Sequence, residues 1–193
     1  MRRLSITAIT LLALASLSCQ TIMQLAATAT PIPTATPLPS PAPVQTDTPI
    51  PLAEYEVPDE GREHVESPTL ANYAHYPPSS GLHYGQILEW GFYQDEIPPE
   101  YWVHSLEHGG IVVLYNCSGD CQATEDALWQ LMDTAPPEDV FNEVKILISP
   151  NAQIESPVVA LAWGWQLDLD SPDYDILLDF YQRHVNLGPE LAP

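Results

Sequence analysis

Three short apolar runs in the second half of the chain have the pattern of buried β-strands. Residues 111–115 form a continuous β-branched and aromatic run, and residues 144–149 alternate around Ile146 and Ile148. Residues 158–167 are apolar on both faces, as expected for a strand at the centre of a sheet. The pattern therefore predicts three strands in this half of the chain.

Two further segments have the 3.6-residue periodicity of amphipathic helices. The first lies between the first and second strands, and its apolar positions are Ala123, Ala127, Leu128, Leu131 and Met132. The second follows the third strand, and its apolar positions are Ile176, Leu177, Phe180 and Tyr181. Ser171 and Pro172 suit its N-cap and first position, and Gly188-Pro189 predicts its end.

These elements follow one another in the order β-α-β-β-α. That order predicts an α/β or α+β fold in which helices pack on a small mixed sheet. A short additional helix is predicted between Pro98-Pro99-Glu100, which favours a helix start, and Gly109-Gly110, which favours a stop. The segment upstream of this helix is rich in turn residues and histidines, so we expect loops there.

The first residues of the chain have the pattern of an export signal. Met1-Arg2-Arg3 is a positive n-region, residues 4–17 are apolar, and Cys19 follows. A small residue before this cysteine resembles a bacterial lipobox, in which the cysteine is lipidated and becomes the new N-terminus. The alternative is an ordinary secretory signal with an incidental cysteine. The lipobox interpretation predicts an extracytoplasmic protein that Cys19 anchors to the cell membrane.

Composition divides the rest of the chain into two parts. Residues 20–68 include a long stretch of Thr, Ala and Pro with few large apolar side chains, so we expect a disordered linker. Residues 69–193 have enough apolar residues for one globular domain with its own core. A spacer of this kind suits a domain that is tethered to a membrane.

The charge balance excludes one class of partner. The chain has 5 Lys+Arg against 26 Asp+Glu, a formal net charge of −21. This charge repels the phosphate backbone, so we expect no nucleic-acid binding.

Two cysteines, Cys117 and Cys121, flank a Ser-Gly-Asp turn. In an exported protein this pair most simply predicts a disulfide bond. A thiolate metal pair and a redox dithiol are the alternatives.

Four histidines and one glutamate are candidate metal ligands. His104 and His108 are four residues apart on the predicted short helix, with Glu107 beside them, so both rings face the same way. His75 and His83 flank a Pro-Pro-Ser-Ser-Gly turn that could place both rings on one side. Imidazole and carboxylate ligands suit Zn²⁺ or Cu²⁺. The alternative is that these histidines only hydrogen-bond to backbone carbonyls. His64 in the linker and His184 beside the last helix are expected to be solvent-facing or structural.

Several of these residues lie in motifs with a specific composition. The motifs are Pro77-Pro78-Ser79-Ser80-Gly81-x-His83-Tyr84, Trp90-Gly91-x-Tyr93, Pro99-Glu100 and Val103-His104-Ser105-Leu106-Glu107-His108-Gly109. Together they resemble the bacterial family catalogued as domain of unknown function 3105, across roughly the whole predicted domain. The linker and the cysteine pair are similar to those of exported lipoproteins in that family. The resemblance implies no activity, so it supports the site and leaves the function open.

Three functions are consistent with these patterns. The first is a membrane-anchored, extracytoplasmic binding module that holds a metal ion through the four histidines and Glu107. The second is a zinc-dependent hydrolase, because His104-x-x-Glu107-His108 matches the inverted zinc-protease pattern, in which the glutamate activates water. Gly109-Gly110 favours the first over the second, because that enzyme class needs a longer helix. The third is a purely structural envelope lipoprotein.

Overall fold

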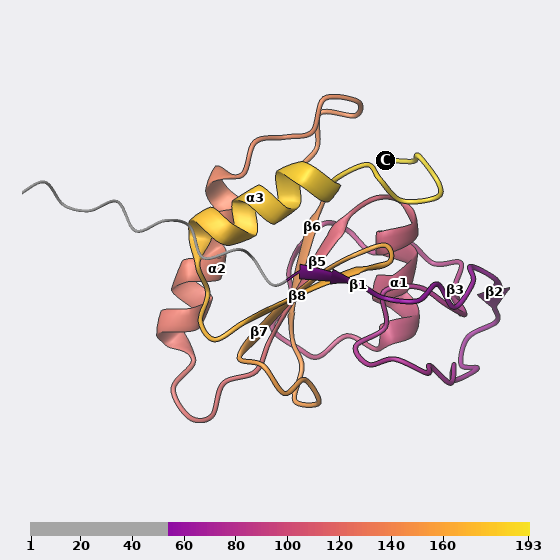
Figure 1. Cartoon of the computed structure of the whole chain (residues 1–193), viewed down its shortest axis with the longest axis horizontal. Helices are drawn as coiled ribbons and strands as arrows, with labels where there is room; N and C mark the ends of the chain where they lie inside the picture. The colour runs from indigo at the N-terminus through magenta and orange to yellow at the C-terminus, as the bar shows by residue number, and fades with distance from the viewer. Residues whose placement is uncertain (1–53) are drawn as a thin grey trace, which may run out of the picture. The chain divides into compact units, whose positions relative to one another are not determined.

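The computed structural model describes residues 54–193 (Figure 1). The predicted signal segment, Cys19 and most of the predicted linker lie outside these residues. Two short strands, β1 (Glu54–Glu56) and β2 (His64–Val65), lie inside the range 20–68 that composition assigns to the linker. The folded part therefore begins before residue 69. A search for hydrophobic patterns does not find β1, because two of its three residues are glutamates and only pairing at a sheet edge makes it a strand.

The main sheet has six strands in the order β1-β8-β7-β5-β6-β4. Its other members are β4 (Gly91–Phe92), β5 (Ile111–Tyr115), β6 (Ile146–Pro150), β7 (Val158–Ala162) and β8 (Trp165–Leu169). β4, β5 and β6 pair in parallel, whereas β5–β7, β7–β8 and β8–β1 pair antiparallel. A second, two-stranded sheet pairs β2 in parallel with β3 (His83–Tyr84). The fold is α+β with a mixed sheet, which confirms the predicted class.

Helices cover both faces of the main sheet. α2 (Gln122–Thr134) and α3 (Tyr174–His184) lie together on one face, and α1 (Pro99–Glu107) lies on the other (Figure 1). Alternate residues of β5 face the two layers: Val113 packs with Leu128 and Phe180, and Val112 packs with the layer of α1. Every residue of β5 is buried, as its continuous apolar run predicts.

The predicted third strand, residues 158–167, is two strands. β7 and β8 form an antiparallel hairpin in which Ala162 pairs with Trp165. Gly164 sits in the turn with φ +71°, a left-handed conformation that glycine adopts without a steric penalty. The run reads as one strand because residues on both sides of this glycine are apolar, and periodicity alone gives no sign of a two-residue turn.

The last helix begins and ends within the segment that the sequence predicts, at different residues. Its N-cap is Asp173, whose Oδ1 accepts a hydrogen bond from Ile176 N at 3.1 Å, so the expectation of Ser171 as N-cap is wrong. The helix ends at His184, and Asn186 takes a left-handed φ of 62°, before Gly188-Pro189.

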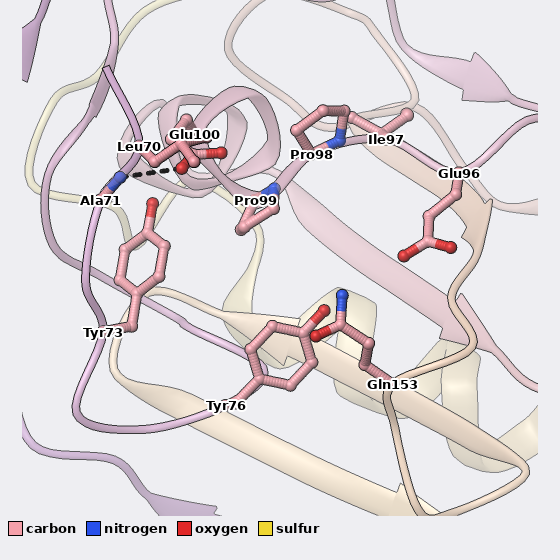
Figure 2. Close-up of a pocket in the computed structure, with 10 residues that line it drawn as sticks. All are labelled: Leu70, Ala71, Tyr73, Tyr76, Glu96, Ile97, Pro98, Pro99, Glu100 and Gln153. Atoms are coloured by element: carbon pink, nitrogen blue, oxygen red, sulfur yellow. Dashed lines mark hydrogen bonds between the residues drawn. The ribbon is translucent and has the colours of Figure 1, made fainter. Parts of the chain in front are cut away.

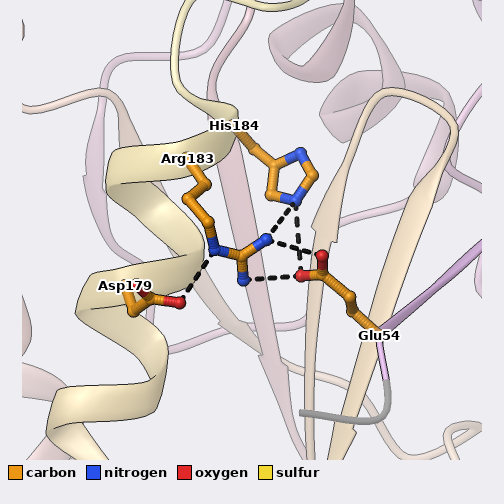
Figure 3. Close-up of polar contacts among 4 residues, drawn as sticks. All are labelled: Glu54, Asp179, Arg183 and His184. Carbon is orange, nitrogen blue, oxygen red and sulfur yellow. Dashed lines mark hydrogen bonds and ion pairs between the residues drawn. The ribbon is translucent and has the colours of Figure 1, made fainter. Parts of the chain in front are cut away.

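A polar cluster fastens β1 to α3, and we call it the β1–α3 cluster: Glu54, Asp179, Arg183 and His184 (Figure 3). The Arg183 guanidinium donates to both oxygens of Glu54, at 2.5 and 2.6 Å, and to Asp179 Oδ2 at 2.8 Å. These hydrogen bonds from Arg183 hold the pKa of Glu54 below its usual value, against the opposing effect of burial. The charged edge strand is thereby held at the domain surface.

Candidate metal centre

The second half of α1 carries two of the predicted ligands, His104 and Glu107, and a third, His108, is its C-cap. Pro98 is its N-cap and Pro99 its first residue, as the sequence predicts, because a proline there loses no intrahelical hydrogen bond. The helix has nine residues and ends at Glu107, with His108 as C-cap and Gly109 at φ +77°. Its buried residues include Trp102, Val103 and Leu106, which seat it on the sheet. The polar side chains of His104 and Glu107 are consequently held in a buried position.

The second part of the site comes from the two-stranded sheet. The parallel pairing of β2 with β3 places His64 opposite His83. The turn before β3 is held by Gly81 N, which donates to Gly61 O at 2.7 Å, and by Ser80 Oγ, which accepts from Glu60 N at 2.8 Å. Residues far apart in the sequence are therefore brought side by side above α1.

Four side chains converge here, and we call them the histidine–glutamate cluster: His64, His83, His104 and Glu107. One ligand atom of each lies within 4.8 Å of those of the other three. Glu107 Oε2 is 3.0 Å from His83 Nε2 and 3.4 Å from His64 Nε2. The His64 and His104 rings stack at 5.1 Å between centroids, and the His83 ring stands edge-on to both. His83, His104 and Glu107 are buried, whereas the His64 side chain is 50% exposed.

The outer nitrogens of two rings are committed to the backbone. His83 Nδ1 is 2.8 Å from Gly81 O, and His104 Nδ1 is 2.7 Å from Tyr84 O. Because a carbonyl oxygen can only accept, each Nδ1 carries a proton and donates it. In a neutral ring, Nε2 then carries no proton and has a free lone pair. In both rings this lone pair points into the cluster.

Burial holds His104 in its neutral form. It lowers the pKa of His104 and outweighs the Tyr84 carbonyl, which would raise it; positive charge on His108, His83 or His64 would lower it further. A neutral imidazole with a free lone pair is the form that binds a metal ion.

The structure changes the predicted ligand set in two places. His75 lies outside the cluster: Glu60 accepts from its backbone N at 2.9 Å, and its Nε2 is 2.8 Å from Gln166 Oε1 on β8. This corrects the expectation that the Pro-Pro turn brings His75 to the side of His83. His64, expected to be solvent-facing or structural in the linker, takes its place.

His108 lies beside the cluster, with its Nε2 3.0 Å from His104 Nε2. A second group of ligand atoms within 4.8 Å of one another consists of Glu107, His108 and Glu190. Sequence reasoning missed both His64 and Glu190. A signal for His64 exists, because from Glu54 onward charged residues replace the Thr, Ala and Pro of the preceding stretch. Glu190, just after Gly188-Pro189, has no signal of its own.

The remaining predicted site residues lie elsewhere. Cys117 and Cys121 lie at disulfide-bonding distance, with their Cα atoms 5.7 Å apart, between β5 and α2. His184, which was expected to be solvent-facing or structural, is buried in the β1–α3 cluster, in contact with the rings of Phe180 and Trp165.

A cavity of about 590 Å³ lies at the opposite end of α1 (Figure 2). Its walls include the rings of Tyr73 and Tyr76 and the first residues of the helix. The buried Glu100 uses one carboxylate oxygen to accept from Ala71 N at 2.9 Å. The lining contains no histidine or cysteine, so this cavity is separate from the metal-ligating groups.

Comparisons with known proteins place the chain in a family. Residues 64–192 match the model of a family described as a protein of unknown function, DUF3105. The chain belongs to this family. The match begins at His64 and extends past Glu190, so it includes every residue of both ligand groups. No curated protein and no solved structure matches the chain. Among residues 54–193, no helix combines the length and the apolar character that crossing a membrane requires.

Proposed function

We propose that this domain binds a divalent transition-metal ion, Zn²⁺ or Cu²⁺, through His64, His83, His104 and Glu107. The observation that supports it is the contact of two ring Nδ1 atoms, those of His83 and His104, with backbone carbonyl oxygens. His83 and His104 each donate a hydrogen bond from Nδ1 to a backbone carbonyl. Their Nε2 lone pairs therefore face the Glu107 carboxylate and the other rings.

Without a cation, this arrangement has acceptors facing acceptors. His83 Nε2 and Glu107 Oε2 are 3.0 Å apart, and neither atom of a neutral ring and an ionised carboxylate can donate. An unsatisfied buried polar group costs about 1–3 kcal/mol, so the contact needs a proton or a metal ion. A proton on His83 would satisfy this contact and leave the Nε2 lone pair of His104 facing the cluster. One metal ion would satisfy all four groups.

The carbonyl contacts also match how metal-binding histidines are usually supported. A ligating histidine typically donates its other N–H to a carbonyl or carboxylate, which fixes the ring and its tautomer. Gly81 O and Tyr84 O have this position. Three imidazoles and a carboxylate suit Zn²⁺ or Cu²⁺. The cluster has no cysteine, and Met132, the one methionine among residues 54–193, lies on α2, so soft Cu⁺ is disfavoured.

The contacts of Glu107 favour binding over hydrolysis. In the hydrolase alternative, His104 and His108 hold zinc and Glu107 activates water. Here the Glu107 carboxylate contacts His83 and His64, so it is a ligand rather than a base standing beside a metal. α1 also ends at Glu107, before a longer zinc-binding helix could form.

We also propose that this module lies outside the cytoplasm, anchored to the membrane by lipid on Cys19. Its support is the signal-like segment before that residue and the Thr/Pro-rich stretch after it. Substitution Cys19→Ser should move the protein from the membrane fraction to the soluble fraction. Retention of Cys19→Ser in the membrane fraction would point to an uncleaved anchor instead.

Metal titration of the full-length protein tests the binding proposal. Chelator-treated protein should gain thermal stability on addition of Zn²⁺ or Cu²⁺, because an ion that binds only the folded state stabilises it. The double variant His83→Ala plus His104→Ala should lose this gain, and the matched control His75→Ala should keep it. A metal-induced rise that survives the double substitution would place the ion elsewhere and overturn the proposal.

A further inference from the structure

We propose that the site holds two metal ions, with Glu107 as a bridging ligand between them. This inference rests on the proposed function. The first position is the histidine–glutamate cluster, and the second is formed by Glu107, His108 and Glu190. Glu107 is the one residue common to both groups of ligand atoms. A carboxylate has two oxygens and can bind one ion with each.

The contact between His104 and His108 supports a second ion. Their Nε2 atoms are 3.0 Å apart, and His104 has already committed its proton to Tyr84 O. His108 Nδ1 lies 3.4 Å from the main-chain oxygen of Pro193. A neutral His108 ring has one N–H. If that N–H is on Nδ1 and donates to Pro193, the Nε2 lone pairs of His104 and His108 face each other. If it is on Nε2 and donates to His104, the His108 Nδ1 lone pair faces the Pro193 oxygen, which is also an acceptor.

Two ions remove this conflict. With the first ion on His104 Nε2 and the second on His108 Nε2, both rings keep their protons on Nδ1 for main-chain oxygens. Metal ions that share a bridging ligand in two-metal proteins lie about 3.5–4 Å apart, a separation that suits ligand groups meeting at one carboxylate.

The C-terminal segment holds Glu190 next to the end of α1. Glu190 N donates to Glu107 O at 3.0 Å. The fully buried Lys145 Nζ donates to His108 O at 3.2 Å and also to Ala192 O, so it joins the end of α1 to this segment. Glu190 is thus positioned by backbone contacts that do not depend on its carboxylate.

The local charge also suits a cation. Two carboxylates and the negative end of the α1 dipole meet at the second position, and together they outweigh the single ammonium of Lys145. The second position has three ligand side chains, and one of them, Glu190, is exposed. The first position has four ligand side chains, and three of them are buried. We therefore expect the first ion to bind more tightly and the second to exchange more readily.

The experiment is a stoichiometry measurement on the full-length protein at saturating Zn²⁺, by calorimetry and by elemental analysis after dialysis. The native protein should bind two equivalents in two steps. Glu190→Gln and, separately, His108→Gln should bind one, with the affinity of the tighter step changed less than threefold. Glu155→Gln, which replaces an exposed carboxylate outside both groups, is the matched control and should bind two.

Cu²⁺ gives an independent readout. The electron paramagnetic resonance signal should grow with the first equivalent and broaden or disappear with the second, because two Cu²⁺ ions on one carboxylate couple magnetically. In Glu190→Gln this loss should not occur.

Each outcome decides between the proposals. One equivalent in both native protein and Glu190→Gln would overturn the second position and leave the first. Two equivalents in Glu190→Gln and in His108→Gln, without magnetic coupling, would place the second ion on other surface acids and overturn it too. No bound metal in the native protein would overturn the proposed function itself.

Discussion

Two regions of this domain place histidine beside a carboxylate, and they differ in what completes the hydrogen bonds. In the β1–α3 cluster, the guanidinium of Arg183 supplies protons to both oxygens of Glu54 and to Asp179 (Figure 3). In the histidine–glutamate cluster, Glu107 has only histidine neighbours among the ion pairs of residues 54–193. The first cluster is complete as it stands, and for the second we propose a bound cation.

The comparison shows that a histidine next to a carboxylate is not by itself a metal site. His184 Nε2 is 3.4 Å from Glu54 Oε2, the same distance that separates His64 from Glu107. The number and direction of the available protons distinguish the two cases. Arginine has five N–H donors and no acceptor, so its presence removes the need for an ion.

Exchanging one histidine in each cluster should give the largest contrast. His83→Gln should weaken Zn²⁺ binding by at least about a hundredfold, since even partners outside the ligand set typically contribute 10–100-fold. His184→Gln should leave that affinity unchanged and lower the free energy of unfolding by about 1–3 kcal/mol, because His184 is buried against Phe180 and Trp165. Chelator competition and urea denaturation measure the two quantities. Equal losses of zinc affinity would mean that the clusters do not differ as described.

Removing the donor from the complete cluster should have a moderate effect. Arg183→Met keeps much of the apolar stem and removes both hydrogen bonds to Glu54. Because the Arg183 side chain is 38% exposed, the expected loss of unfolding free energy is only about 1 kcal/mol. The pKa of Glu54 should return toward its ordinary value, which a carboxylate NMR titration can follow. An unchanged titration of Glu54 would contradict the role assigned to Arg183.

Glu138 provides a third carboxylate, satisfied mainly by the backbone. Burial alone would raise its pKa, but Asn186 Nδ2 and the backbone N–H groups of Val140, Phe141 and Glu143 together lower it to about 2. In acid, the unfolded state therefore binds more protons than the folded state. The stabilisation of the folded state by Glu138 is full above about pH 4.5 and is lost as pH falls toward about 2. Glu138→Gln should flatten the decline of stability over that range. Denaturation curves at several pH values test this, and an unchanged slope would count against it.

The cysteine pair should have the smallest effect on either cluster. Cys117 and Cys121 should resist alkylation until a reductant is added, because they lie at disulfide-bonding distance. Reduction should leave the zinc affinity unchanged, because neither cysteine belongs to a ligand group. Mass spectrometry after alkylation gives the result, and free thiols in the aerobically purified protein would revive the thiolate-ligand interpretation.

The sequence predicts best what depends on neighbouring residues. The strand at 111–115 follows from its apolar run, and α1 follows from the prolines before it and the glycines after it. The fold class follows from the order of such elements. The sequence did not predict the β7–β8 hairpin, because its two-residue turn, which contains Gly164, lies between two apolar runs.

The candidate ligand set was harder to predict because it depends on contacts between distant segments. His64 reaches the cluster through parallel pairing of β2 with β3, and a two-residue strand has no periodicity to detect. His75 is turned toward β8 because Glu60 binds its backbone, a contact that the spacing around the Pro-Pro turn does not reveal. His104 and Glu107 were predicted correctly as neighbours because one helix carries both.

The junction between α1 and the C-terminal segment limits how this family can vary in evolution. Added to Gly109, a side chain would meet Asn186 Cα at 2.7 Å; at Gly188 it would meet Leu106 O at the same distance. Backbone thus lies directly on backbone, with no flexible side chain that could move aside. If the second ion binds as proposed, a lineage that lost it would be free to replace Glu190, whereas the fold would still require both glycines. Variation at residue 190 beside invariance at 109 and 188 would therefore record the loss of an ion without the loss of the domain.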